Sequence, residues 1–202
     1  MGLAVIPRRL ILSIDAILRR LYGIREFSDN PNCIFRLAHV TSWREVTLSD
    51  GTCIQPREPI GEIHFWNEHL PPFPEQGVDL TWGMTFNRRI QQSLREMAAY
   101  IDSHPEWDEA RAFFATPPFG GVKRGEQLYR GIRHFGFDMF NFPLGSSLPA
   151  RFATFWERVY LFALIWAFNS ASLQYKDFNI IRRVEIWISR EKLMHKYLVA
   201  DE

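Results

Sequence analysis

At 202 residues with a formal net charge of +1, the chain fits a single domain, and its charge does not favour a nucleic-acid partner. A 47% hydrophobic and 15% aromatic composition is enough for a core that folds without disulfides or metal. The spacing of the two cysteines, Cys33 and Cys53, fits no metal or redox motif. We therefore expect free thiols and a cytoplasmic protein. The most apolar run, residues 159–168, is too short to span a bilayer and predicts a buried helix.

The N-terminal segment, residues 1–23, carries no recognisable signal peptide and is predicted to form an amphipathic helix. Its apolar positions Leu10, Ile14, Ile17 and Leu21 recur at helical spacing, while four arginines lie on and around the other face. Two interpretations follow. The helix packs on the domain, or it lies on an anionic membrane surface and makes the protein peripheral to the membrane.

The remaining elements are predicted from alternating and helical apolar patterns. In chain order we expect strands at 33–40, 45–48, 52–54 and 62–66, a helix at 81–103, a helical turn at 106–111, a strand at 112–116, a helix at 125–135, a strand at 136–142, a helix from 148 to about 172, a strand at 182–189 and helical turns at 191–199. The pair Asp50-Gly51 indicates a type I′ hairpin turn. Together these elements predict one α+β domain over residues 1–202, with a mixed or mostly antiparallel sheet packed with several helices.

The densest group of side chains able to act as acids, bases or ligands lies on and just after the strand at 62–66. Alternation places Glu62, His64 and Trp66 on one face of that strand, while Ile63 and Phe65 face the core. Glu62 and His64 are the candidate catalytic pair, with the imidazole as general acid or base and a carboxylate orienting it. Alternatively, the two residues make only cross-strand hydrogen bonds to arginines.

Further polar and aromatic residues extend this candidate site. Asn67 and Trp66 are predicted to bind substrate, with Glu68 and His69 at the rim. The five-residue separation of His64 and His69 fits no standard zinc motif, so no metal site is predicted.

A second strand is expected to contribute to the same surface. If residues 182–189 neighbour the strand at 62–66, Glu185 and Trp187 add a carboxylate and an indole ring to it. Such a surface suits sugar stacking combined with hydrogen bonding.

A second candidate is the glycine-rich loop between the strand at 112–116 and the helix at 125–135. Backbone N–H groups at Gly121 and Gly125, with Lys123 and Arg124, are able to hold a pyrophosphate at a helix N-terminus. This pattern suggests coenzyme A as a cofactor and an acetyltransferase-like fold. The pattern is not specific, because glycine pairs before helices are common.

Three segments resemble the YkoP-like domain family of bacteria: LSDGTCIQPREPIGEIHFWNEHL, RHFGF and RRVEIWISREKLMHKY. The matching positions are Asp50, Gly51, Thr52, Gly61, Glu62, His64 and Asn67. Members of that family resemble domains attached to, or encoded near, polysaccharide deacetylases and glycosyltransferases. The resemblance therefore implies a cell-envelope setting, and it brings no activity with it.

Three functional hypotheses follow. The first is an enzyme or accessory protein acting on an envelope glycan or lipid-linked sugar through Glu62 and His64. The second is an acyl-CoA-dependent N-acyltransferase, and the third is a non-catalytic interaction module.

Overall fold

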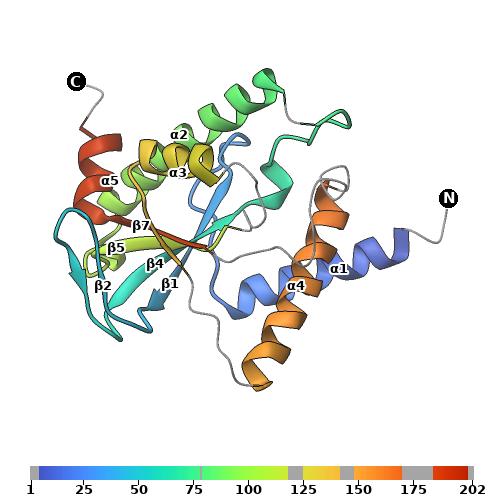
Figure 1. Cartoon of the computed structure of the whole chain (residues 1–202), viewed down its shortest axis with the longest axis horizontal. Helices are drawn as coiled ribbons and strands as arrows, with labels where there is room; N and C mark the ends of the chain where they lie inside the picture. The colour runs from blue at the N-terminus through green and yellow to red at the C-terminus, as the bar shows by residue number, and fades with distance from the viewer. Residues whose placement is uncertain (1–4, 78, 118–124, 142–147, 170–183, 200–202) are drawn as a thin grey trace.

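The computed structural model describes residues 5–77, 79–117, 125–141, 148–169 and 184–199. Its elements in chain order are α1 (Val5–Leu21), β1 (Phe35–Thr41), β2 (Val46–Thr47), β3 (Cys53–Ile54), β4 (Pro59–Phe65), the 3-10 turn η1 (Asn67–His69), α2 (Leu80–Ser103), the 3-10 turn η2 (Pro105–Trp107), β5 (Ala112–Ala115), α3 (Gly125–His134), β6 (Asp138–Asn141), α4 (Leu148–Asn169), β7 (Val184–Ser189) and α5 (Arg190–Tyr197) (Figure 1). The predicted elements are all present, with ends shifted by a few residues.

In the described part of the chain, the main sheet has five strands in the order β1-β4-β5-β7-β6, and β2 and β3 form a separate two-stranded sheet. The β4–β5 pair is parallel and the other pairs are antiparallel, which confirms a mixed sheet in an α+β fold. The last strand, β7, therefore enters between β5 and β6. Outside β1, a single bridge joins Arg25 to Leu37 and covers part of that sheet edge.

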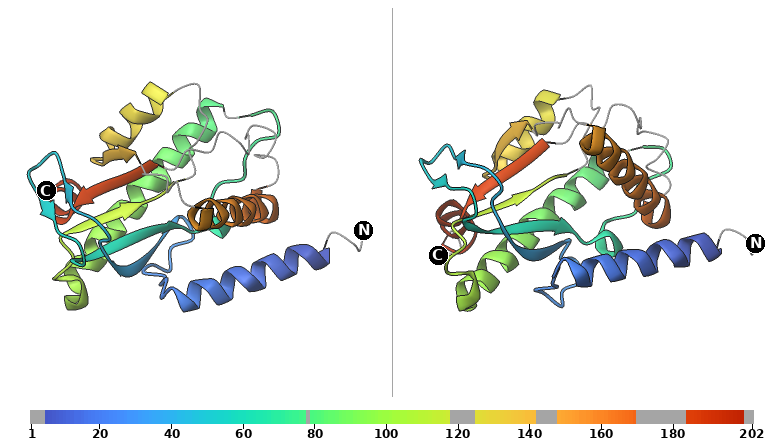
Figure 2. Two further views of the ribbon diagram at one scale, coloured as in Figure 1. Left: turned by 60° about the horizontal axis from the view of Figure 1, so that its bottom comes forward. Right: turned by 90° about the horizontal axis from the view of Figure 1, so that it is seen from below.

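One face of the sheet carries the larger hydrophobic core, which packs against α2, α3 and α5 (Figures 1 and 2). On this face alternation places Ile63 of β4, Phe113 of β5 and Ile188 of β7, all buried. The helix α2 contributes Leu94 and Met97 to the same core. Its first turn is capped by the side chain of Asp79, which accepts a hydrogen bond from the Trp82 N–H at 2.7 Å.

The opposite face is covered at one end by the β2–β3 hairpin. A second, smaller core forms there from the hairpin residues Val46, Leu48 and Ile54 and the sheet residues Ile60, Ala112 and Trp187. Because the hairpin is short, it leaves the part of this face near the C-terminal end of β4 uncovered by β2 and β3.

The hairpin turn at Asp50-Gly51 differs from the predicted type I′ turn. Gly51 has a φ of 88°, whereas Asp50 is not among the described residues with positive φ. The Leu48 N–H donates to the Thr52 carbonyl, and the Gly51 N–H donates to the Leu48 carbonyl. The loop therefore has three residues and needs left-handed backbone only at the glycine.

The carboxylate of Asp50 fastens this turn to the main sheet. It accepts hydrogen bonds from the Ser189 hydroxyl at the end of β7 and from the Thr52 N–H. Burial by itself would raise the pKa of Asp50, but these hydrogen bonds outweigh it and leave the pKa below its ordinary value.

The helices α1 and α4 pack against each other, away from the hairpin (Figures 1 and 2). The apolar stripe of α1 faces solvent: Leu10, Ile14, Ile17 and Leu21 are 60%, 42%, 57% and 74% exposed. The helix does contact the rest of the chain, but its apolar stripe is not the side that makes these contacts. The contacts of α1 are made from its opposite side, which carries Asp15.

The helix α4 is also less buried than predicted. Phe155 and Trp156 are half-exposed, Trp166 is exposed, and of the residues 159–168 only Ala167 is buried among those whose side chains are described. The helix packs on α1 rather than inside the domain, which is why a nearly all-apolar segment keeps exposed rings. No helix in the described part of the chain is long and apolar enough to cross a membrane.

Gly61 allows β4 to pass directly beneath two aromatic rings. A Cβ atom at this position would overlap the Phe113 ring, approaching Cε1 to 2.6 Å, and would lie 3.1 Å from Trp107. We predict that Gly61→Ala lowers the free energy of unfolding by about 2 kcal/mol through overpacking. Chemical denaturation measures this effect, and Gly51→Asn is the control. Asparagine tolerates the positive φ of this position, and its side chain would enter open space. Equal stability of wild type and Gly61→Ala would contradict the packing described here.

Candidate functional site

Glu62 and His64 lie side by side on the part of the sheet that the hairpin leaves open. Nε2 of His64 is 3.4 Å from Oε2 of Glu62, and the two side chains are 30% and 25% exposed. Alternation along β4 sends both to the same face, as predicted, while Ile63 between them is buried on the other face. The pair is close enough to share a proton, and both side chains are partly exposed, although the Nε2 atom of His64 is itself buried.

The strands on either side of β4 decide what surrounds this pair. In the register of β1 and β4, Arg36 lies opposite His64 and Ala38 opposite Glu62. In the parallel β4–β5 register, Phe114 lies beside Glu62. Arg36 and Phe114 were missed by the sequence reasoning. They lie far from β4 along the chain, so no local pattern could have found them.

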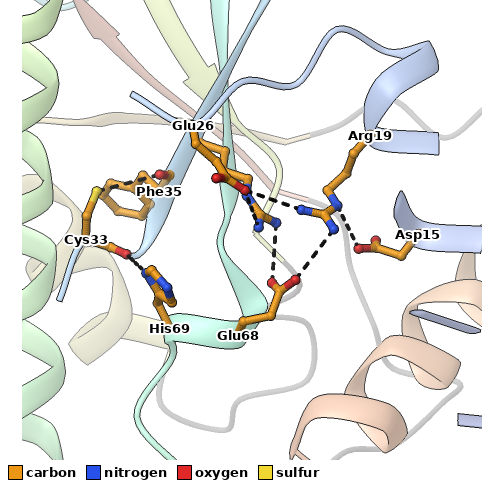
Figure 3. Close-up of polar contacts among 8 residues, drawn as sticks. Asp15, Arg19, Glu26, Cys33, Phe35, Glu68 and His69 are labelled. Atoms are coloured by element: carbon orange, nitrogen blue, oxygen red, sulfur yellow. Dashed lines mark hydrogen bonds and ion pairs between the residues drawn. The ribbon is translucent and has the colours of Figure 1, made fainter. Parts of the chain in front are cut away.

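A network of ion pairs lies beside the pair and is centred on the buried guanidinium of Arg36. Figure 3 labels its other members, Asp15, Arg19, Glu26 and Glu68. Arg36 Nη2 donates to Glu26 at 2.9 Å, and Nη1 donates to Glu68 at 3.3 Å. Arg19 of α1 lies 3.7 Å from Glu26 and 3.6 Å from Glu68, and it pairs with Asp15 at 3.0 Å. Glu68, predicted as a rim residue, instead joins β1, β4 and α1 electrostatically.

Trp66 is part of the same structural cluster and does not form an exposed platform. Its ring lies between Arg36, whose guanidinium carbon is 4.4 Å from the ring centroid, and His69, which stacks at 3.7 Å. Nδ1 of His69 is in turn 2.8 Å from the Cys33 carbonyl oxygen. Only 9% of Trp66 is exposed, so its role here is packing. Asn67 begins η1 directly after it and is partly exposed.

Glu185 and Trp187 do not line the same open surface as Glu62. The expectation that their strand neighbours β4 is wrong, because β5 lies between β4 and β7. Both residues are fully buried beneath the hairpin. The Arg44 guanidinium donates to Glu185 at 2.5 Å, and the Trp187 indole N–H donates to the same oxygen at 3.2 Å. These contacts neutralise a buried carboxylate and hold the β1–β2 connection onto the sheet.

The second candidate, the glycine-rich loop, falls largely outside the described residues. Gly121, Lys123 and Arg124 lie there, and Gly125 is the first residue of α3. The acetyltransferase-like arrangement would need an opening between the strands at 112–116 and 136–142. β7 instead hydrogen-bonds to β5 on one side and to β6 on the other, so these strands belong to one continuous sheet.

The open pair has the components of a general acid–base site. At 3.4 Å the contact between His64 and Glu62 is longer than a good hydrogen bond, as is common before a substrate is bound. Nε2 of His64 is buried and makes no hydrogen bond to any described residue. Within the described ranges there is no group of three or more His, Cys, Asp or Glu residues arranged to hold a metal ion.

Comparison with known families identifies the family of the chain. The family model of the YkoP domain matches residues 6–197, which is nearly the whole sequence. The chain belongs to the YkoP domain family. A comparison with curated proteins and a comparison with solved structures each returned no match. In this YkoP domain, Gly61, Glu62 and His64, which carried the resemblance in the sequence, all lie on β4, and Asp50 and Gly51 belong to the hairpin turn.

Arg36 is predicted to stabilise the fold rather than to act on a ligand. We expect Arg36→Met to lower the free energy of unfolding by about 2 kcal/mol, because Glu26 and Glu68 lose their shared partner and Trp66 loses its cover. Arg88→Met, at an exposed position of α2, is the control and should change stability by less than about 0.5 kcal/mol. Thermal and urea denaturation measure both. If the denaturation midpoints of Arg36→Met and wild type were equal, the ion-pair network would make no net contribution to stability.

Proposed function

We propose that this YkoP domain binds, and acts on, a cell-envelope glycan or lipid-linked sugar at the open sheet face around Glu62 and His64. The observation that carries the proposal is the adjacency of these two side chains, 3.4 Å apart and each about a quarter to a third exposed. A sugar offers hydroxyl groups that both donate and accept hydrogen bonds. A carboxylate and an imidazole on one surface match that chemistry.

The neighbouring residues support a sugar more than a highly charged ligand. Phe114 lies next to Glu62 in the register and is partly exposed, so it offers an apolar surface to the C–H face of a pyranose ring. The nearest guanidinium, Arg36, is already held by Glu26 and Glu68. Its charge is therefore largely neutralised.

The chemical role proposed for the pair is proton transfer to or from a sugar hydroxyl. His64 is the acid or base, and Glu62 orients its ring and stabilises the imidazolium that forms. If the domain does not catalyse a reaction, the same two groups serve as hydrogen-bonding partners in an accessory binding module. Turnover separates these two possibilities, because the binding module gives none.

The proposal predicts that the pair contributes to sugar binding. We expect His64→Ala and Glu62→Gln each to weaken binding of a chitin hexamer or a prenyl-diphosphate-linked N-acetylglucosamine by about tenfold, equivalent to about 1.4 kcal/mol. His195→Ala, at an exposed position of α5, is the matched control. Titration calorimetry on the full chain makes the measurement. Binding that is the same in all four proteins would overturn the assignment of this face.

We also propose that α1 brings the domain to an anionic membrane surface. The exposed stripe from Leu10 to Leu21 is flanked on one side by Arg9 and Arg20, about 90° away around the helix, and both are exposed. Asp15, the sole acidic residue of α1, is turned away from this surface and is paired with Arg19 and Tyr160. An apolar stripe bordered by positive charge suits a helix lying in the headgroup region.

Liposome flotation tests this membrane contact. We expect the double variant Leu10→Ser, Ile17→Ser to lose binding to vesicles containing phosphatidylglycerol. Arg9→Gln with Arg20→Gln should weaken it roughly 30-fold, from about 1 kcal/mol for each arginine. Leu80→Ser with Met84→Ser removes equally exposed apolar residues from α2 and serves as the control. Equal flotation of wild type and the α1 variants, or binding independent of lipid charge, would contradict the proposal.

The acyl-CoA-dependent transferase alternative has less support. The transferase hypothesis requires an opening between β5 and β6, but β7 lies between these two strands. The loop residues 118–124 are not described. No specific observation on the described residues favours coenzyme A over a sugar.

A further inference from the structure

An apolar cavity of about 240 Å³ lies between α2, α3 and the sheet, on the opposite face from Glu62 and His64. Its base is formed by Phe35, Ile63 and Ile186 of the sheet, and its walls include Phe86 and Ile90 of α2 and Phe135, which directly follows α3. Among the described residues of the lining, Asn87 is the polar one. The cavity is partly open to solvent, so its apolar lining lies against water unless a ligand covers it, and this is unfavourable.

Two glycines keep this space open. Gly83 on α2 and Gly131 on α3 both line the cavity, and a Cβ added to either would meet nothing within 4 Å. Glycine is unfavourable inside a helix, and neither position has a positive φ that would require it. Facing helices thus both carry the smallest residue where a side chain would fit. A ligand that occupies the space accounts for both.

The size and chemistry of the cavity indicate what the ligand is. At interior packing density, this volume accommodates roughly eight to ten methylene groups. A lining of aromatic and aliphatic side chains offers a polar ligand almost no hydrogen-bonding partners. A single hydrocarbon chain fits both the volume and the lining.

The charges next to the lining indicate the kind of head group. Arg88 and Arg89 follow Asn87 on α2, and Arg130 and Arg133 lie beside the lining residues of α3. Arg88, Arg130 and Arg133 are exposed, and Arg133 also lines a second pocket together with Asp138. Exposed arginines that neighbour the lining residues in sequence favour an anionic amphiphile over a neutral one.

We propose that this cavity binds the single hydrocarbon chain of an anionic amphiphile, a fatty carboxylate or an alkyl or prenyl phosphate. The site is separate from the sugar-binding face, because the sheet lies between them. The double variant Glu62→Gln, His64→Ala therefore leaves chain binding unchanged, so failure of one proposal is distinguishable from failure of the other.

Titration calorimetry with decanoate, decyl phosphate and decanol, each below its critical micelle concentration, tests the proposal. Wild type should bind both anions with a negative heat-capacity change, and the tighter of the two identifies the head group. Decanol should bind at least fivefold more weakly. No binding of either anion would overturn the cavity as a site, and decanol binding as tightly as the anions would overturn the anionic head group.

Filling the cavity tests the role of the glycines. Gly83→Leu and Gly131→Leu should weaken decanoate binding more than tenfold while keeping or raising the melting temperature, since each removes a helix glycine. Ala99→Leu, an exposed small-to-large change on α2, should leave binding unchanged. If a leucine variant fails to fold, Gly83→Ala should still bind about threefold more weakly than wild type. Wild-type affinity in the folded glycine variants would overturn the assignment.

Discussion

The structure depends on strand β4 being hydrogen-bonded along both edges, antiparallel to β1 and parallel to β5. A strand held on both sides cannot twist its side chains away from the pleat, so alternate residues are fixed on opposite faces. Ile63 is therefore buried beneath the helices, while Glu62 and His64 are held together on the other face. The proposed sugar face and the apolar cavity are consequently two sides of one strand.

The second constraint is electrostatic and joins the N-terminal helix to the sheet. Arg36 is almost fully buried, and its charge is balanced by Glu26 and Glu68, which also pair with Arg19 of α1 (Figure 3). These contacts use the polar side of α1 and leave its apolar stripe in solvent. An amphipathic helix held by its polar side is free to present the other side to a second apolar surface, such as a bilayer.

Local sequence patterns were sufficient for a large part of this description. Apolar periodicity predicted the helices and strands to within a few residues, and alternation along β4 correctly paired Glu62 with His64. These features succeed because they depend on residues close together in the chain, whose relative positions the helix or strand period determines.

Strand order, register and burial were decided by the tertiary structure. Nothing near Glu185 or Trp187 in sequence shows that β7 pairs with β5 rather than β4, or that the hairpin buries both. Trp66 became a packed ring because Arg36, from another strand, covers it. The sequence by itself determined which residues share a face of an element. Which face is covered, and by what, depends on contacts between segments far apart in the chain, and local periodicity carries no information about those contacts.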